Sequence, residues 1–186
     1  DGGSMTNTWA QNGSSGYIGS LVGYSNGTVI NAQSSVAVNA QNEIYVGGLV
    51  GNNGFTGDIS KSSATGNIFS MGNQNASIGG LVGSNSGTIS NSYSTSAIVG
   101  TVSTQFYNCG GLIGYAPFGT IANSYSTGAV SCPKLNNSSG GFVGNSQSAT
   151  FTNNFTARPI NRSVSGYLGS FAGQDYSPVY DTNYFD

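Results

Sequence analysis

Residues 79–95 read Gly-Gly-Leu-Val-Gly-Ser-Asn-Ser-Gly-Thr-Ile-Ser-Asn-Ser-Tyr-Ser-Thr, and this stretch decides the fold because it recurs along the chain. Residues 110–114 repeat it as Gly-Gly-Leu-Ile-Gly, and residues 119–127 continue as Gly-Thr-Ile-Ala-Asn-Ser-Tyr-Ser-Thr. Looser copies make six leading glycines in all, separated by 28, 32, 31, 30 and 29 residues: Gly19, Gly47, Gly79, Gly110, Gly140 and Gly169. Self-similarity at a nearly fixed period of this size predicts stacked structural repeats.

Aligned copies place one type of side chain at each offset. We expect the first apolar offset to stack as one buried column, made of Leu21, Leu49, Leu81, Leu112 and Phe142. Three short apolar segments per repeat, separated by Gly, Ser and Asn, predict three short β-strands. A helix is disfavoured, because each repeat holds several glycines and each costs about 1 kcal/mol relative to alanine in a helix.

The pattern therefore predicts an all-β fold, a right-handed parallel β-solenoid (β-helix) of about six coils with roughly 30 residues per coil. We expect one domain over residues 1–186: an irregular N-terminal partial coil at 1–16, repeats at 17–173, and a C-terminal partial coil or cap at 174–186. One polar column is expected to form a ladder of side-chain amides, namely Asn31, Asn91, Asn123 and Asn153.

The composition narrows the classes of partner. Only 5% of the 186 residues are charged, against about 25% in an average globular domain, and the net charge is −2. We therefore expect neither a nucleic-acid partner nor membrane insertion, and no run of about 18 apolar residues is present. Aromatic residues make up 11% of the chain, which argues against disorder. The first residue is Asp1, so we expect a mature or trimmed product.

Two cysteines, Cys109 and Cys132, flank the fourth repeat. Both stand at offsets expected to point inward, so we predict a disulfide between them; the alternative is a pair of small buried thiols. The chain is poor in Lys and rich in Ser, Thr and Asn, which suits an extracellular location where a disulfide persists.

The pattern Gly-Gly-Leu-Val-Gly-x-Asn-x-Gly-Thr-Ile-x-Asn-Ser-Tyr-x-Thr resembles the GLUG repeat over roughly residues 17–186. That repeat occurs in large secreted and surface proteins of bacteria and some eukaryotic microbes, many of them adhesin-like. Some are IgA-specific metallopeptidases whose catalytic domain lies elsewhere. The resemblance implies an extracellular repeat module and brings no catalytic residues. Nothing in the chain resembles the zinc-protease motif His-Glu-x-x-His.

The sequence offers little that could carry catalysis. It contains no histidine, which excludes a Ser–His or Cys–His nucleophile pair and a zinc site built on imidazole. The acids are scattered, whereas a glycosidase needs two carboxylates about 5–10 Å apart. Asp175, Asp181 and Asp186 form the only acidic cluster, for which a solvated tail is favoured over a calcium site. We expect no enzymatic activity, catalytic residue, metal ligand or cofactor.

Two sets of residues are candidates for surface roles. Four Asn-x-Ser/Thr sequons lie between coils and are plausible N-glycosylation sites, so the chain is a candidate glycoprotein: Asn12, Asn75, Asn136 and Asn137. Five tyrosines beside the glycine corners are candidate ligand-contacting aromatics, with filling of the corners over bare glycine as the alternative: Tyr17, Tyr24, Tyr45, Tyr115 and Tyr167.

The leading hypothesis is a non-enzymatic extracellular structural or adhesive module at a cell surface. Both ends of the chain read as incomplete coils, so we expect a head-to-tail fibre subunit, with self-assembly or a cell-surface protein or glycan as the partner. One alternative is ice binding through a threonine column, namely Thr28, Thr88, Thr120 and Thr150. The other is a β-helix that binds or acts on polysaccharide.

Overall fold

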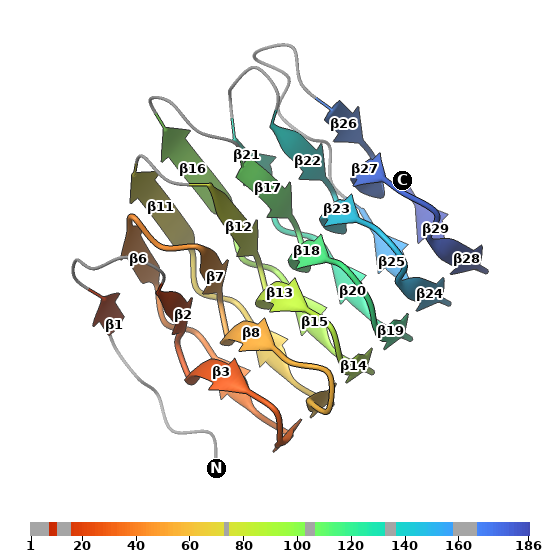
Figure 1. Ribbon diagram of the computed structural model, residues 1–186, viewed down its shortest axis with the longest axis horizontal. Helices are drawn as coiled ribbons and strands as arrows, with labels where there is room; N and C mark the ends of the chain where they lie inside the picture. The colour runs from red at the N-terminus through yellow and green to blue at the C-terminus, as the bar shows by residue number, and fades with distance from the viewer. Residues whose placement is uncertain (1–7, 11–15, 73–74, 103–106, 133–136, 158–166) are drawn as a thin grey trace.

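In the computed structural model, the residues described are 8–10, 16–72, 75–102, 107–132, 137–157 and 167–186. They form 29 short β-strands and no helix (Figure 1). Neighbouring strands pair in parallel with residues about one repeat away, as Val82 does with Val50 and Ile113. The chain is therefore an all-β parallel solenoid with roughly 30 residues per coil, as the spacing of the glycines predicted; the right-handed sense stays a prediction.

Five parallel sheets run along the solenoid, and each coil visits them in the order B, C, D, E and A. Sheet B comprises β2 (Tyr17–Gly19), β7 (Tyr45–Gly47), β12 (Ala76–Gly79), β17 (Tyr107–Gly110), β22 (Ser138–Gly140) and β26 (Tyr167–Gly169). Sheet C comprises β3 (Val22–Ser25), β8 (Val50–Asn53), β13 (Val82–Asn85), β18 (Ile113–Ala116), β23 (Val143–Ser146) and β27 (Ala172–Asp175).

The remaining three sheets complete each coil. Sheet D comprises β4 (Thr28–Ile30), β9 (Asp58–Ser60), β14 (Thr88–Ser90), β19 (Thr120–Ala122), β24 (Thr150–Thr152) and β28 (Val179–Asp181). Sheet E comprises β5 (Gln33–Ser34), β10 (Ser63–Ala64), β15 (Tyr93–Ser94), β20 (Tyr125–Ser126), β25 (Phe155–Thr156) and β29 (Tyr184–Phe185). Sheet A comprises β1 (Thr8–Ala10), β6 (Val38–Gln41), β11 (Ile68–Gly72), β16 (Ile98–Val102) and β21 (Val130–Ser131).

A full coil therefore has five strands, and the prediction of three was wrong. Sheets C, D and A contain the apolar segments that the sequence made visible. The strands of sheet E are only two residues long, and in β15 the buried residue is Ser94 while Tyr93 lies outside. The strands of sheet B end in glycine, and their outer residue is aromatic or polar, as Tyr45 is in β7 and Asn108 in β17. Neither pattern contains an apolar run, so periodicity could not reveal these strands.

The buried apolar side chains divide into two clusters. One is built around the Leu column and the inner residues of sheets C and D, such as Val82 and Ile89. The other fills the space between sheets A and B and includes Ile68, Ile78 and Ile98. The core is thus continuous along the axis of the solenoid but split across it.

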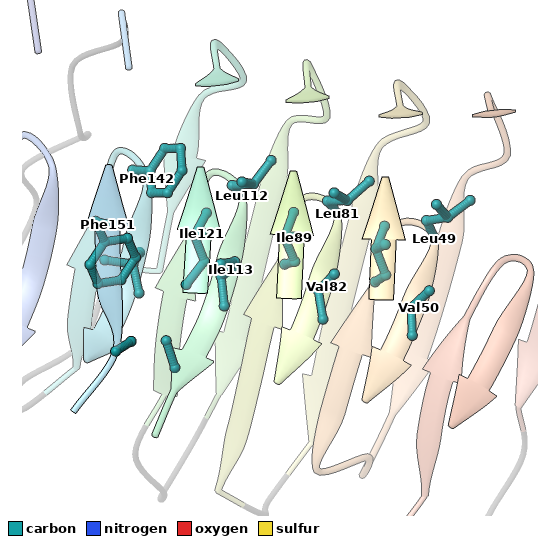
Figure 2. Close-up of a cluster of buried hydrophobic side chains, with 14 of the residues drawn as sticks. Leu49, Val50, Leu81, Val82, Ile89, Leu112, Ile113, Ile121, Phe142 and Phe151 are labelled. Carbon is teal, nitrogen blue, oxygen red and sulfur yellow. The ribbon is translucent and has the colours of Figure 1, made fainter. Parts of the chain in front are cut away.

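The predicted Leu column is present inside the stack and open at its beginning. Leu49, Leu81, Leu112 and Phe142 are fully buried and lie in a row (Figure 2). Leu21, which begins the same column, is 48% exposed. Each inner member is covered by the coil on both sides, whereas Leu21 lies in the first coil of the described stack. Burial at this offset therefore depends on stacking.

Sheets B and C approach so closely that backbone faces backbone. A Cβ added to Gly83 in β13 would lie 2.5 Å from the backbone nitrogen of Val46 and 2.6 Å from the carbonyl oxygen of Gly51. A Cβ on Gly79 in β12 would lie 1.9 Å from the carbonyl oxygen of Val82. Real Cβ atoms do not make such contacts, so these repeating positions require glycine.

The corner between sheets D and E holds the predicted asparagine column, but its main role is conformational. The corner residues share a positive φ: Asn31, Lys61, Asn91, Asn123, Asn153 and Thr182, with φ between 49° and 55°. Asparagine tolerates this left-handed region better than most residues do. One bond of the expected amide ladder is present, because the Asn153 amide donates to the Asn123 oxygen at 2.7 Å.

A second, buried polar ladder follows directly after that corner. The backbone N–H of Ser62 donates to Ser92 Oγ at 3.1 Å, and the N–H of Ser92 donates to Ser124 Oγ at 3.2 Å. The ladder continues when the N–H of Ser124 donates to Asn154 Oδ1 at 3.0 Å. Each side chain therefore satisfies a backbone donor of the preceding coil, which would otherwise be buried without a partner.

The predicted disulfide joins Cys109 in β17 to Cys132, just beyond β21, with Cα atoms 6.5 Å apart. It closes sheet A against sheet B inside the second apolar cluster. Gly100 of β16 makes room for it, because an added Cβ would lie 2.7 Å from Cys132 Sγ. In sheet A, Gly100 pairs with Ser70 of the preceding coil, and Ser70 pairs with Ala40 of the coil before that.

The terminal segments are more regular than expected. Within residues 1–16, Thr8–Ala10 is a strand that pairs in parallel with β6. At the other end, β28 and β29 pair with β24 and β25, so residues 174–186 continue the coil and do not fold over it.

Replacing a leucine of this column by alanine should cost more stability in an inner coil than in the first coil. Leu81→Ala removes a fully buried side chain and should lower the free energy of unfolding by about 2–5 kcal/mol through the cavity that it leaves. The matched control, Leu21→Ala, removes the same atoms from a half-exposed site and should cost much less. Chemical denaturation of both variants measures the difference, and equal losses would contradict the register.

Adding a side chain between sheets B and C should destabilise the chain only at the glycines where the two backbones touch. Gly83→Ala forces a methyl group against two backbones and should destabilise the chain by about 1–3 kcal/mol or more. Gly27→Ala is the control, because an added Cβ there meets nothing within 4 Å. Its effect should stay within about 0.5 kcal/mol, as is usual for surface substitutions. Thermal unfolding of the two alanine variants gives the comparison, and a harmless Gly83→Ala would refute the close contact.

Candidate functional site

Sheets B and C run next to each other along the solenoid (Figure 1), and the outer residues of each sheet form a column. By register, the sheet B column is Tyr17, Tyr45, Ser77, Asn108, Ser138 and Tyr167. The sheet C column is Tyr24, Asn52, Ser84, Tyr115, Asn145 and Gln174. All five tyrosines singled out from the sequence therefore fall in these two columns.

A groove of about 380 Å³ lies over these columns. Part of its lining is formed by Ile44, Asn75 and Ala76. The rest comes from the two columns: Tyr45, Ser77, Asn108, Tyr115, Ser138, Asn145 and Gln174. Its described lining contains no Asp, Glu, Lys or Arg. We define the part formed by these seven residues as the B/C groove. It is the candidate site, because it joins aromatic rings to a neutral, hydrogen-bonding floor.

The five predicted tyrosines differ in their contacts and in their distance from the groove. Tyr17 stacks on Tyr45 with ring centroids 5.3 Å apart, and Tyr24 lies 6.0 Å from Tyr17 at a tilt. Tyr45 and Tyr115 line the groove. Tyr167 belongs to the same column as Tyr45 and is 53% exposed at the far end. The alternative role of filling corners applies best to Tyr17 and Tyr24, which contact each other.

Amides and hydroxyls are linked across the floor of the groove. Asn108 Nδ2 donates to Ser77 Oγ at 3.2 Å. Gln174 Oε1 accepts from both Ser138 Oγ at 3.0 Å and Asn145 Nδ2 at 3.3 Å. Gln174 Nε2 in turn donates to the Tyr176 hydroxyl. These bonds hold the side chains of neighbouring coils in fixed positions.

One acceptor in this floor has no partner. Asn145 Oδ1 is buried and makes no hydrogen bond within the structure. Leaving a buried acceptor unsatisfied costs roughly 1–3 kcal/mol, so such an atom calls for an explanation. Asn145 also lines the B/C groove, so the unsatisfied oxygen lies beside the candidate site.

Both groove tyrosines stay protonated at physiological pH. Burial raises the pKa of Tyr45, with Tyr17 adding to the rise, although a hydrogen bond with Ser84 opposes it. Burial also raises the pKa of Tyr115, and Tyr45 adds to it, against a hydrogen bond with Gln147. The two rings are thus neutral and have their hydroxyls anchored by neighbouring side chains.

Sequence reasoning found the tyrosines but missed the polar residues between them. Asn108, Ser138, Asn145 and Gln174 occupy the same offsets in their repeats as the tyrosines do in others. An alignment of the repeats by column would have placed them together. The sequence pattern did not predict the strands of sheet B. Without those strands, nothing indicated that the two columns are neighbours.

The threonine column lies on a different surface, the outer face of sheet D. Thr88, Thr120 and Thr150 are paired in adjacent strands. Asp58 interrupts the column between Thr28 and Thr88. In the second outer column of this sheet only Thr152 repeats the threonine, so a single Thr-x-Thr rank is complete, in β24. The array expected of an ice-binding face is therefore fragmentary here.

The candidate glycosylation sites are not equivalent. Asn75 is exposed, which suits an acceptor. Asn137 is 1% exposed; its Nδ2 donates to the Cys132 carbonyl at 3.2 Å, and its Oδ1 accepts from the Tyr107 N–H. The folded chain does not present this amide, so the expectation for Asn137 is corrected: it serves as a structural link. Asn12 and Asn136 lie outside the described residues.

The acidic residues do not gather into a metal site in the part of the chain that the structure describes, where no group of three potential ligands was found. In the C-terminal cluster, Asp175 accepts a hydrogen bond from the Tyr180 hydroxyl at 2.7 Å. Burial raises the pKa of Asp175, and the bond from Tyr180 opposes the rise. The same stretches of chain hold no helix long and apolar enough to cross a membrane.

Comparison with known protein families agrees with the architecture. The family model described as the GLUG motif matches residues 42–68 and 74–102. The second match spans β12 to β16, which is one complete coil, and the first spans β7 to the start of β11. One motif thus corresponds to one turn of the solenoid. No curated protein and no solved structure matches the chain.

Glu43, next to the groove residue Ile44, is an unusual buried acid. Its side chain is 5% exposed and lies against Gly16, where an added Cβ would collide with the carboxylate. The oxygen Oε2 has no hydrogen-bond partner in the structure. Burial raises the pKa of Glu43 above 4.5, and a hydrogen bond from the Gly16 backbone only partly offsets this.

Glu43→Gln should stabilise the protein at neutral pH. As pH rises through 4.5, the unfolded chain ionises before the folded chain does, so stability falls until the folded pKa is passed. The Gln variant lacks this loss. Its unfolding temperature should exceed that of the parent chain at pH 7 and approach it at pH 4. Scanning calorimetry at the two pH values is the measurement, and a difference that does not change with pH would contradict the assignment.

Proposed function

We propose that this chain, which belongs to the GLUG-repeat family, is a non-enzymatic structural and adhesive module of the cell exterior. We propose further that it assembles head to tail with other copies of itself. The repeat module is the established part: GLUG motifs stack as coils of a β-solenoid. The observation that carries the proposal is the chemistry of the two outermost described coils. Their faces are apolar and offer unpaired strand edges.

The C-terminal end is the more hydrophobic. Strands β26 to β29 pair with the preceding coil only. Here Tyr180 is 42% and Phe185 64% exposed, whereas Phe151, which precedes Tyr180 in its column, is fully buried. A hollow of about 430 Å³ opens on this end, lined in part by Phe171, Tyr180 and Phe185. Such a face gains stability when another layer covers it.

The opposite end has matching features. Strands β2 to β5 have described partners on one side only. Leu21 is 48% and Ile30 54% exposed. Leu21 begins and Phe171 ends the same column. The C-terminal end of one copy could therefore continue this apolar column at Leu21 of the next copy.

Two such faces form a heterologous contact. The top of one solenoid fits the bottom of the next by the same parallel pairing that joins its own coils. A contact of this kind does not close on itself and produces a filament. The solenoid is thus suited to add length to a fibre without a change of fold.

Two features support an extracellular setting. The disulfide between Cys109 and Cys132 lies inside the second apolar cluster, and disulfides persist in oxidising compartments. The buried polar ladders provide hydrogen bonds without charged side chains, in keeping with a chain that is only 5% charged. Adhesion would then use the sides of the rod, while its ends serve assembly.

Electron microscopy and light scattering of the 186-residue chain test the assembly. We expect filaments whose length grows with concentration. Leu21→Lys places a charge on the N-terminal face and should raise the concentration needed for assembly by tenfold or more, because burial of one leucine contributes about 1.5–3 kcal/mol.

Phe69→Lys is the matched control, since Phe69 is 40% exposed on the outer side of sheet A, where it pairs between Asn39 and Val99. This variant should assemble like the parent chain. A monodisperse monomer at high concentration, or filaments insensitive to Leu21→Lys, would rule out the head-to-tail contact.

A further inference from the structure

The B/C groove owes its shape to a gap in a column of rings. In the outer column of sheet B, Tyr45 is followed by Ser77, Asn108 and Ser138 before Tyr167 restores an aromatic residue. Ser77 is 5% and Ser138 3% exposed, so the small side chains lie low. Four strand spacings of about 4.8 Å separate Tyr45 from Tyr167, or roughly 19 Å along the axis.

Tyr45 and Tyr115 both have small or polar neighbours in their columns on at least one side. Tyr17 covers one face of Tyr45, and the next residue of the column on the other side is Ser77. Tyr115 stands between Ser84 and Asn145 in its own column, so it has no aromatic neighbour there. Both hydroxyls are hydrogen-bonded, to Ser84 and to Gln147, so little side-chain freedom would be lost on binding.

The aromatic column of sheet E provides a contrast. Tyr93 and Tyr125 stack on each other with centroids 4.8 Å apart and an angle of 2° between their planes. This contact covers one face of Tyr125, and Phe155 follows Tyr125 on the other side of the column. We call this the closed stack, because Tyr125 has an aromatic neighbour on both sides, although it is 38% exposed.

The floor of the groove is suited to a neutral partner rich in hydroxyl groups. It consists of amide and hydroxyl side chains, namely Asn108, Ser138, Asn145 and Gln174. The strands below it are already paired on both sides, so a peptide could not join the sheet through its backbone. Recognition must therefore use side chains alone.

We propose that the B/C groove binds an extended, uncharged oligosaccharide, with sugar rings resting on Tyr45 and Tyr115 and sugar hydroxyls bonding to the amide side chains of the floor. The ligand class rests on the adhesive role proposed above and gives it a site. A volume of about 380 Å³ lies within the usual range for ligand sites. The length of the gap lets several sugar units follow the repeat of the coils.

Affinity electrophoresis tests the site with defined polymers cast into native gels. The neutral probes are hydroxyethyl cellulose, glucomannan and laminarin, and the anionic probes are polygalacturonate and alginate. The parent chain should be retarded by at least one neutral polymer and by neither anionic polymer. Tyr115→Ala and, separately, Asn145→Ala should each weaken that retardation tenfold or more.

Tyr125→Ala is the control, because it removes a tyrosine of the closed stack on sheet E. It should leave retardation unchanged. Circular dichroism and thermal unfolding establish that each variant is folded. No retardation by any neutral polymer, retardation by the anionic polymers alone, or equal losses in Tyr115→Ala and Tyr125→Ala would overturn the proposal.

Microscopy of the same preparations keeps the two proposals apart. Filaments without retardation would remove the oligosaccharide site and leave the assembly standing. Retardation without filaments would do the reverse.

Discussion

The contact of backbone with backbone between sheets B and C is the constraint on which the rest of the structure depends. At Gly83 no Cβ fits, because Val46 and Gly51 lie within 2.6 Å of where it would stand. The two sheets therefore touch without side chains between them. This contact divides the interior into one apolar cluster on the side of sheets C and D and another between sheets A and B.

The same close approach creates the candidate site. Because the inner faces of sheets B and C meet at glycine, their outer residues come together as adjacent columns. Where a column carries tyrosine the surface is raised, and where it carries Ser77 or Ser138 it is low. A groove along the axis thus follows from the choice of side chain at a single offset, with no change in the backbone repeat.

The buried hydrogen bonds of the interior are made by uncharged groups. Serine oxygens of one coil accept from backbone N–H groups of the coil before, as Ser92 does for Ser62. Asn53 and Asn85 are fully buried and joined by a bond of 2.7 Å from Nδ2 to Oδ1. Stacking in register repeats each bond from coil to coil, so a chain of low charge holds buried hydrogen bonds along its length. Among the described residues, Glu43 is the exception to this lack of buried charge, and its Oε2 has no partner.

The sequence by itself determined the repeat, the all-β class, the stacked Leu column and the pairing of Cys109 with Cys132, because like side chains recur at equal offsets when coils lie in register. Only the tertiary structure decided that a coil has five strands, that Asn137 is buried, and that Tyr45 and Tyr115 share a groove with Asn145. The periodicity of the sequence indicates which residues stack on one another along the axis. It does not record how a coil bends across the axis, and that bend sets which columns become neighbours.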